Sequence, residues 1–383
     1  MPLDVLIAGG GPAALEAALT FHRVAPDDVT VTLLAPESEF TYRPLSVLGP
    51  FAAGAATRYA MTRIGADAGF EHRRDTLERV DASAHTVHTG GGDELSYEAL
   101  LVAVGAVPRA PYERALTFGG PDDEERVHGL IQDVEGGYLH RIAFVVPPSS
   151  SWPLPLYEVA LMLAQRAYDM GVDLELHLIT PEERPLAIFG QGPSREVGDL
   201  LERRAGIHVH TAATADMPSP REVRLIPGGT TLEVARVVTL PLLGGPRLQG
   251  LPADAEGFLP VDRHGAVQGV ADVWAAGDAT SFPVKQGGLA CQQADAAAEA
   301  IAVRAGAPVV AEPFVPVLRG LLLTETAARY LRRDAGGAAG DASESSGVPL
   351  WWPPTKIAGR ELAAYLAELE PRDARGHRIA VPV

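Results

Sequence analysis

Short apolar runs alternate with helix-forming stretches along the chain, and two strand–helix–strand units stand out. In the first, the runs 4–8 and 29–34 flank an alanine-rich helical stretch over 13–21. In the second, the runs 141–146 and 172–179 flank another helical stretch. Runs that stay apolar at consecutive positions are typical of parallel strands buried on both faces. The pattern therefore predicts an α/β fold built on parallel sheets.

The turn of the first unit has the spacing of a dinucleotide-binding loop. Gly9, Gly11 and Ala14 form G-x-G-x-x-A directly between the strand and the helix. We expect Gly9 to make the tight turn, Gly11 to leave room for a pyrophosphate and Ala14 to let the helix pack closely. Pro12 and Ala13 open the helix, whose free N–H groups would face the phosphates. This unit is therefore predicted to be Rossmann-like.

The acidic residue that usually ends the second strand of such a unit is displaced here. Ala35 follows the strand, and Glu37 comes two residues late. In this fold a carboxylate at the strand end binds the ribose hydroxyls of the adenosine. Glu37 or a backbone group at Ala35 could take that role, so this position does not settle which dinucleotide binds.

Two later segments carry a resemblance to a known family. Residues 97–109 (YEALLVAVGAVPR) and 272–280 (DVWAAGDAT) resemble segments of the pyridine nucleotide–disulfide oxidoreductases, flavoproteins with two dinucleotide-binding domains. The resemblance implies FAD as the cofactor. It implies that Asp278 accepts hydrogen bonds from the ribitol hydroxyls, since a carboxylate is a strong acceptor. It also places Gly105, at the crossing between the domains, beside the cofactor.

The same resemblance assigns further cofactor contacts. Arg43 would lie along the cofactor, and the backbone of Val80 would contact the adenine. A helix near residue 288 would point its N-terminus at the flavin, with the N–H groups of Leu289 and Ala290 against the ring. Cys291 is the single cysteine, which excludes an intramolecular disulfide, and we expect it to be a small buried residue.

The turn of the second unit contains no glycine. Residues 147–158 read PPSSSWPLPLYE, where the prolines remove N–H donors and Trp152 fills space that a pyrophosphate would need. Tight NAD(P)H binding by the usual mode is therefore not expected. The helix opening over 155–161 resembles that of sulfide:quinone oxidoreductases, but the cysteine that they carry in this turn is replaced. Sulfide oxidation by their cysteine route is therefore not expected.

Two residues are candidates for chemistry beside the flavin. Glu158 opens the second helix and could relay protons to the flavin or a quinone, or serve a structural role only. Lys285 resembles a lysine near the flavin in quinone-reducing relatives, or is an ordinary loop lysine; Lys356 is the only other lysine. His208 and His210 share a strand face without nearby carboxylates, so no metal site is predicted.

Composition narrows the classes of partner. A net charge of −17 repels phosphate backbones, so nucleic acid is not an expected partner. No apolar run reaches the roughly 18 residues of a membrane span, and no signal-peptide pattern is present, so we expect a cytoplasmic protein. Trp351 and Trp352 could cover the flavin pocket or touch a membrane surface, and both alternatives stay open, as does a homodimer.

These observations give a predicted organisation. The FAD-binding domain would comprise residues 1–110 and 245–305, and a second Rossmann-like domain with a degenerate loop would comprise 111–244. Residues 306–383 would form a C-terminal cap. Within the cap, the small polar residues 333–349 predict a loop.

The leading functional hypothesis is an FAD-dependent oxidoreductase. The resemblance extends to sulfide:quinone oxidoreductases and type II NADH dehydrogenases, which implies a small-molecule or quinone-like substrate. One alternative is a flavin-binding redox sensor or partner-binding module without efficient turnover. A second is an NAD(P)H-dependent flavin reductase with an atypical loop.

Overall fold

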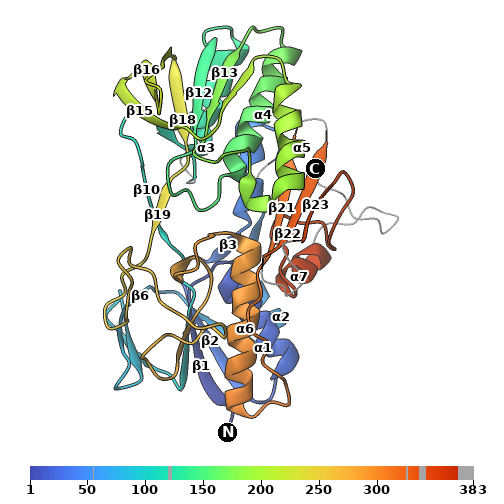
Figure 1. The fold of residues 1–383 in the computed structure, drawn as a ribbon. Coiled ribbons are helices and arrows are strands. Elements are labelled where there is room, and N and C mark those ends of the chain that lie inside the picture. The colour runs from blue at the N-terminus through green and yellow to red at the C-terminus, as the bar shows by residue number, and fades with distance from the viewer. Residues whose placement is uncertain (55, 120–122, 325–326, 336–341, 370–383) are drawn as a thin grey trace.

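The chain folds into two α/β bodies, the lower and the upper body of Figure 1, with a smaller C-terminal part beside them. An antiparallel ribbon of β10 (Val107–Arg109) and β19 (Leu242–Gly244) runs between the bodies. The predicted α/β class with two Rossmann-like units is confirmed, whereas the domain boundaries stay a prediction. This computed structural model describes residues 1–54, 56–119, 123–324, 327–335 and 342–369.

The lower body contains a parallel sheet with the strand order β5–β2–β1–β9–β20. The chain leaves β1 through α1 toward β2, while β9 lies on the other side of β1. The turn after β1 therefore sits where the connections diverge, which is where open α/β sheets bind ligands. The elements are β1 (Leu3–Ala8), α1 (Pro12–Val24), β2 (Val29–Leu34), β5 (Phe70–Arg73), β9 (Ala99–Val102), β20 (Val273–Ala275) and α6 (Gly287–Ala305).

The upper body repeats this topology with the order β14–β13–β12–β18–β11. The predicted strand–helix–strand unit is confirmed. The elements are β11 (Leu116–Thr117), α3 (Asp123–Glu135), β12 (Arg141–Val145), α4 (Leu154–Asp169), β13 (Glu175–Ile179), α5 (Gln191–Glu202), β14 (Ile207–His210) and β18 (Arg236–Thr239).

The C-terminal part is an antiparallel sheet of β21 (Val317–Leu323), β22 (Ala328–Asp334) and β23 (Ala342–Ser346), followed by α7 (Leu362–Leu369). The loop predicted over 333–349 is wrong where β22 and β23 pair, and its residues 336–341 lie outside the described residues. Most residues of β23 are exposed, so its sequence has no apolar pattern that would predict a strand. We call residues 355–361, just before α7, the strap.

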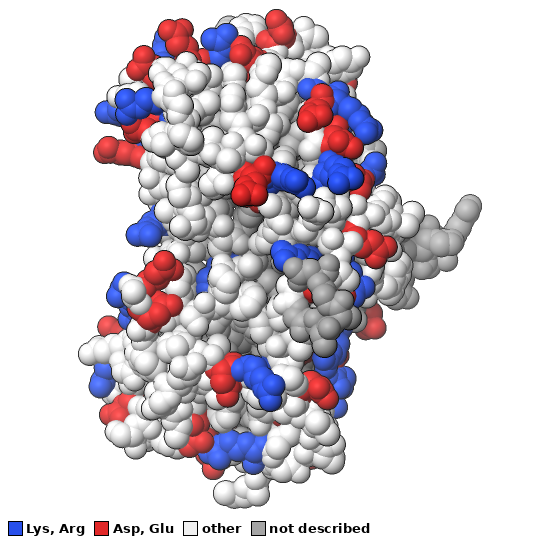
Figure 2. All heavy atoms as spheres, in the orientation of Figure 1, with Lys and Arg blue, Asp and Glu red and all other residues white. Residues whose placement is uncertain are grey.

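Acidic and basic side chains are interspersed on the face drawn in Figure 2. None of the helices in the described ranges has the length and apolarity to cross a membrane.

Smaller elements complete the two bodies. The remaining elements are β3 (Glu39–Thr41), η1 (Arg43–Phe51), β4 (Arg58–Ala60), α2 (Met61–Ala68), β6 (Leu77–Asp81), β7 (Thr86–Thr89), β8 (Glu94–Ser96), η2 (Ala187–Phe189), β15 (Thr214–Ser219), β16 (Glu222–Ile226), β17 (Thr231–Glu233) and η3 (Gly277–Ala279).

Candidate functional site

The glycines of the first turn have different surroundings. Gly9 has a φ of 129°, and a Cβ added there would overlap the carbonyl oxygen of Ala103. Gly11 has an extended backbone, with φ −88° and ψ −172°, and an added Cβ would meet no atom within 4 Å. Gly9 is therefore required by the fold itself, whereas Gly11 faces space that is empty of protein.

The N-terminus of α1 opens onto that space. Pro12 occupies the first helical turn, where it has no N–H to satisfy. Within the described ranges, the N–H groups of Ala13 and Ala14 have no hydrogen-bond acceptor, while Leu15 already donates to Gly11. Free N–H groups at a helix N-terminus, beside an open glycine, provide the environment that a phosphate group prefers.

Asp278 lies close to this turn although it is 265 positions from Ala13 in the sequence. A Cβ added at Gly277 would stand 3.1 Å from Cβ of Ala13 and 3.3 Å from Cβ of Ala290. The absence of a side chain at Gly277 thus allows η3, α1 and α6 to meet. The open space at Gly11 and the free N–H groups of α1, which we call the phosphate cradle, therefore lie near Asp278. That both hold one cofactor stays a prediction.

The Asp278 carboxylate is a half-buried acceptor without a donor. It accepts no hydrogen bond from any residue that the structure describes. Burial raises the pKa of Asp278 to about 6, against the opposing effect of Lys285. A carboxylate that is largely withdrawn from water normally has a hydrogen-bond partner. A ligand that carries both hydroxyls and a pyrophosphate, as FAD does, would supply partners for Asp278 and for the cradle.

A cavity of about 310 Å³ lies in front of Asp278, and we call it the central cavity. It is bounded by the lower body, the upper body and the C-terminal part. Its wall includes Arg43, Asp278, Lys285, Gly287, Ser150, Ser151, Trp152, Leu154, Glu158, Gly320, Leu321, Lys356 and Ile357.

Lys285 lies in the wall of the central cavity beside Asp278. Its Nζ donates to the carbonyl oxygen of Thr280 and stands 3.7 Å above the centre of the Phe258 ring. Burial lowers the pKa of Lys285 to about 8, and the negative charge of Asp278 limits the fall. This lysine is therefore a buried cation of the cavity and not a solvated loop residue.

Glu158, the other candidate, is fully buried and paired. Its carboxylate oxygens lie 2.6 Å and 2.7 Å from Nζ of Lys356, and its Oε1 also accepts the N–H of Leu323 at 2.8 Å. Burial raises the pKa of Glu158 and lowers that of Lys356, while their attraction opposes both shifts. The sequence reasoning missed Lys356 as a site residue. The chain has only two lysines, and both line the central cavity. The rarity of lysine in the sequence could therefore have pointed to Lys356.

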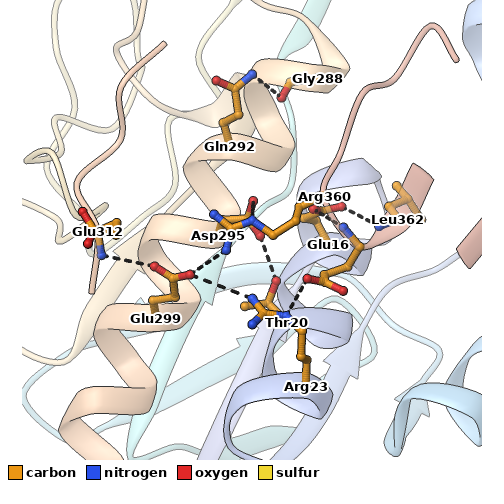
Figure 3. Close-up of polar contacts among 11 residues, drawn as sticks. Glu16, Thr20, Arg23, Gly288, Gln292, Asp295, Glu299, Glu312, Arg360 and Leu362 are labelled. Atoms are coloured by element: carbon orange, nitrogen blue, oxygen red, sulfur yellow. Dashed lines mark hydrogen bonds and ion pairs between the residues drawn. The ribbon is translucent and has the colours of Figure 1, made fainter. Parts of the chain in front are cut away.

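The strap that carries Lys356 is fastened to α1 and α6. Figure 3 shows side chains of these helices converging on it. The Glu16 carboxylate accepts the N–H groups of Glu361 and Leu362, each at 2.8 Å. The Arg360 guanidinium lies 2.7 Å from Oε1 of Glu299. These contacts hold the C-terminal end of the strap.

The strap also packs closely along its middle. The N–H of Ile357 donates to the hydroxyl of Tyr42 at 2.8 Å. A Cβ added at Gly359 would overlap Oε2 of Glu16, so only glycine lets the strap approach α1 this closely. Together these contacts fix the direction from which Lys356 enters the central cavity.

The predicted backbone contacts of Leu289 and Ala290 need correction. The N–H of Leu289 donates to the side chain of Gln286, and the N–H of Ala290 donates to its carbonyl oxygen. Both donors are therefore used within the protein. The N–H groups of Gly287 and Gly288 have no acceptor in the described part of the chain, so these positions replace Leu289 and Ala290 as the donors that α6 offers a ligand.

Two of the other predicted cofactor residues lie at the edge of this region. Arg43 is exposed and lines the central cavity. Gly105 has a φ of 78°, and a Cβ added there would meet no atom within 4 Å. Their contacts with a cofactor stay predictions.

The residues predicted near the adenosine differ in whether their polar groups are free to bind a ligand. Ala35 is buried, and its N–H donates to the carbonyl oxygen of Arg73. Glu37 is exposed, with Oε2 on the side of the first turn where Gly10 lies. The N–H of Val80 donates to the carbonyl oxygen of Gln249 at 2.9 Å, so this group is not free for an adenine.

The second turn lacks the features of the first. Trp152 packs edge-on against Phe189, with ring centroids 5.7 Å apart, and lines the central cavity. Pro155 has no N–H, and the N–H of Leu156 donates to the carbonyl oxygen of Pro153 at 3.0 Å. The start of α4 therefore offers few donors to a phosphate.

Other predicted features lie outside the central cavity. Cys291 is fully buried between α6 and α1, as expected. Trp351 and Trp352 do not line the central cavity but a neighbouring one, and both alternatives for them stay predictions. His208 and His210 lie beside His177, and the described residues contain no group of His, Cys, Asp and Glu arranged to hold a metal ion.

Comparison with known proteins gives a family and several structures. The family model of the pyridine nucleotide-disulphide oxidoreductases matches residues 3–137. The sulfide:quinone oxidoreductase of the hyperthermophilic bacterium Aquifex aeolicus has a TM-score of 0.78 at 18% identity, covering 90% of this chain and 87% of that one. No curated protein matches the sequence.

Two further structures share the fold. A ferredoxin reductase from Rhodopseudomonas palustris has a TM-score of 0.64 at 19% identity, over 88% of this chain and 84% of that one. NDH2 from Plasmodium falciparum, in complex with NADH, has a TM-score of 0.59 at 15% identity, covering 73% of this chain and 65% of that one. Residues 3–137 therefore match the family of the pyridine nucleotide-disulphide oxidoreductases, and the chain as a whole shares the fold of these solved structures.

Proposed function

We propose that the chain is an FAD-dependent oxidoreductase whose flavin ring occupies the central cavity. The observation that carries this proposal is the meeting of an open phosphate cradle at Gly11 with the unpartnered carboxylate of Asp278. FAD has a pyrophosphate for the first and ribitol hydroxyls for the second. When bound, it would supply two-electron redox chemistry that protein side chains lack.

The residues of the lower body would stabilise negative charge in the cavity. Lys285 is a buried cation, and the free N–H groups of Gly287 and Gly288 begin α6, so a positive potential faces the cavity from this side. With a pKa of about 8, Lys285 exchanges its proton near neutral pH. It can therefore hold or release a proton at the cavity wall.

Glu158 and Lys356 would form a proton-holding pair on the opposite wall. Their atoms are 2.6 Å apart, and burial shifts the two pKa values toward each other. A proton can therefore move from Nζ of Lys356 to Oε1 of Glu158 at a smaller free-energy cost than between solvated groups. The pair would deliver a proton to a reduced acceptor in the cavity.

The cavity favours a small planar acceptor such as a quinone. Trp152, Leu154 and Leu321 give it apolar walls, and the buried ion pair lies among them. The second turn offers a pyridine nucleotide few donors, so an electron donor other than NAD(P)H in the usual mode is expected. The Aquifex aeolicus sulfide:quinone oxidoreductase has the same fold, which supports a quinone-like acceptor here.

The visible spectrum of the purified chain, before and after incubation with FAD, tests cofactor binding. We expect oxidised flavin, with the Asp278→Asn variant binding FAD at least about tenfold more weakly because a charge-assisted hydrogen bond is lost. Protein that stays colourless after incubation with FAD would overturn the proposal.

An anaerobic titration then tests turnover. NADH, NADPH and sulfide are added separately, and a water-soluble quinone is added to the reduced protein. Reduction by a donor followed by quinone reoxidation supports the oxidoreductase. A bound flavin that no donor bleaches points instead to a redox sensor or partner-binding module. Fast bleaching by NADH alone points to a flavin reductase with an atypical loop.

A further inference from the structure

A second cavity, of about 440 Å³, lies beside the central cavity, and we call it the outer cavity. The two share a wall. Arg319 lines the outer cavity while the next residue, Gly320, lines the central one, and the same holds for Ala358 and Ile357 of the strap. The amide of Gln286 donates to the carbonyl oxygen of Arg319 at 3.3 Å and to one of the strap at 3.4 Å, which ties this wall together.

Arg319 is the unusual residue of the outer cavity. Within the described ranges its guanidinium makes no hydrogen bond or ion pair. Burial and the like charge of Arg332 lower its pKa, and only Asp334 opposes them. A guanidinium carries a rigid fork of donors, and a partly desolvated one lacks compensation until an anion accepts from it. A carboxylate can do so with two parallel hydrogen bonds.

Two of the acidic residues that line the outer cavity, Asp295 and Glu299, already have partners. Arg360 lies 2.7 Å from Glu299 and 3.7 Å from Asp295, as Figure 3 shows. Glu299 also accepts the N–H of Glu312 at 3.1 Å. Burial and the neighbouring Glu16 raise the pKa of Asp295 to about 8, against the opposing effect of Arg360. Arg360 thus compensates the two acidic side chains that α6 presents to the cavity.

Two aromatic rings of the outer cavity are held in place from behind. Trp351 donates its indole N–H to the carbonyl oxygen of Thr355 at 2.9 Å and packs edge-on against Tyr330, with centroids 5.1 Å apart. Phe314 packs edge-on against Phe282 at 5.1 Å. Fixed aromatic walls favour a flat apolar body over a flexible one.

We propose that the outer cavity binds a small aromatic carboxylate, with its carboxylate on Arg319 and its ring against Trp351 and Phe314. The site is separate from the cofactor region, because no residue of the first turn lines it. Its occupancy therefore does not depend on whether the central cavity holds FAD.

Isothermal titration of the full chain with three probes of similar shape tests the charge requirement. The probes are benzoate, neutral benzamide and cationic benzylamine. We expect saturable binding of benzoate and at least about tenfold weaker binding of the other two, which corresponds to a free-energy difference of about 1.4 kcal/mol. Failure of benzoate to bind, or tighter binding of benzylamine, would overturn the proposal.

Two arginine variants on neighbouring strands test the residue assignment. Arg319→Gln should weaken benzoate binding at least about tenfold. Arg332→Gln makes the same charge change at the cross-strand neighbour of Arg319, outside the cavity wall, and should keep the affinity within about threefold. Equal affinity in both variants would rule out Arg319 as the anion site. Arg319→Lys, which keeps the charge without the fork, should give an intermediate affinity even if Arg319→Gln folds poorly.

Discussion

The turns after β1 and β12 occupy equivalent places in two sheets of the same strand order, yet they are built differently. The first turn leaves space before Gly11 and free N–H groups at the start of α1. In the second, Trp152 and Pro155 stand where such a space and such donors would be. Topology therefore fixes where a dinucleotide site can form, and the side chains of the turn decide whether it forms.

The helices that follow these turns extend the contrast. α1 begins with unsatisfied backbone donors that face an opening. α4 carries the Glu158 carboxylate, which Lys356 of the strap satisfies across 198 sequence positions. The first region is thus incomplete without a ligand, whereas the second is completed by the chain itself. Substitutions that enter the open space of the first region should mainly affect cofactor affinity, and those that break the Glu158–Lys356 ion pair should lower stability.

The largest effect is expected from Lys356→Met. It leaves the Glu158 carboxylate buried without its cation, which should lower the free energy of unfolding by about 3–5 kcal/mol at pH 8. Losing the cation raises the pKa of Glu158 further, so the carboxyl becomes neutral as the pH falls. The loss relative to the unmodified protein should therefore shrink toward pH 5. Urea unfolding of the cofactor-free protein at several pH values measures it.

A double-mutant cycle controls for general disruption of the strap. Glu158→Gln combined with Lys356→Met removes both charges, and this variant should be more stable than Lys356→Met alone. A loss at pH 8 below about 1 kcal/mol in the single variant would show that the second region does not depend on this pair.

A matched pair of glycine variants probes the first turn. Gly9→Ala should lower the free energy of unfolding by about 2 kcal/mol or more, because φ is positive and the new methyl group overlaps Ala103. Gly11→Ala should leave the stability of the cofactor-free protein nearly unchanged, since its backbone suits alanine and the space is open. It should nevertheless weaken FAD binding at least about tenfold, because the methyl group occupies the cradle.

Thermal unfolding of the cofactor-free proteins and quenching of flavin fluorescence separate these two effects. Gly11→Ala protein that binds FAD normally would contradict the cradle. Gly9→Ala protein of normal stability would contradict the close approach of the turn to Ala103.

The sequence was most informative where the structure is local. The strand, glycine turn and helix at residues 4–21 lie within one short segment, so spacing alone located the cradle. Asp278 is distant, but it ends a recognisable strand motif. By contrast, the pairing of Lys356 with Glu158 depends on how the C-terminal part folds back, and no local pattern encodes it.

Two wrong predictions, the free N–H groups in α6 and the loop at β23, have a common origin. Both depend on hydrogen bonds that the local sequence pattern does not reveal. The family resemblance predicts that the N–H groups of Leu289 and Ala290 face the flavin. In fact Gln286 caps the helix and takes both donors. Likewise β23 is an exposed edge strand, so its polar sequence predicted a loop although its backbone pairs with β22.

A smaller effect is expected on the pKa of Lys285, which can be measured by NMR because Lys356 is the only other lysine of the chain. Lysine labelled with ¹³C at Cε should give two resonances, assigned with Lys285→Arg and Lys356→Arg variants. We expect Lys285 to titrate near pH 8, and Asp278→Asn to lower that midpoint because a stabilising negative charge is lost. Since its pKa of about 8 is below the usual 10.5, the unfolded chain binds more protons between these values. The contribution of Lys285 to stability therefore rises with pH across that window. A midpoint above pH 10 would contradict its burial.

The smallest effect is expected from removing the Trp152 side chain from the second turn. This change tests whether the bulk of the ring or the lack of free N–H groups keeps the second turn from binding a dinucleotide. Trp152→Gly removes the ring that fills the turn, but Pro155 still lacks an N–H and Leu156 still donates to Pro153. If missing donors prevent phosphate binding, NADH affinity should change by less than about threefold, as measured by NADH fluorescence titration. Trp152→Phe, which keeps an aromatic ring, is the control. A gain of about tenfold or more in Trp152→Gly would mean that the second turn is blocked only by its side chain, and that both turns remain competent to bind a dinucleotide.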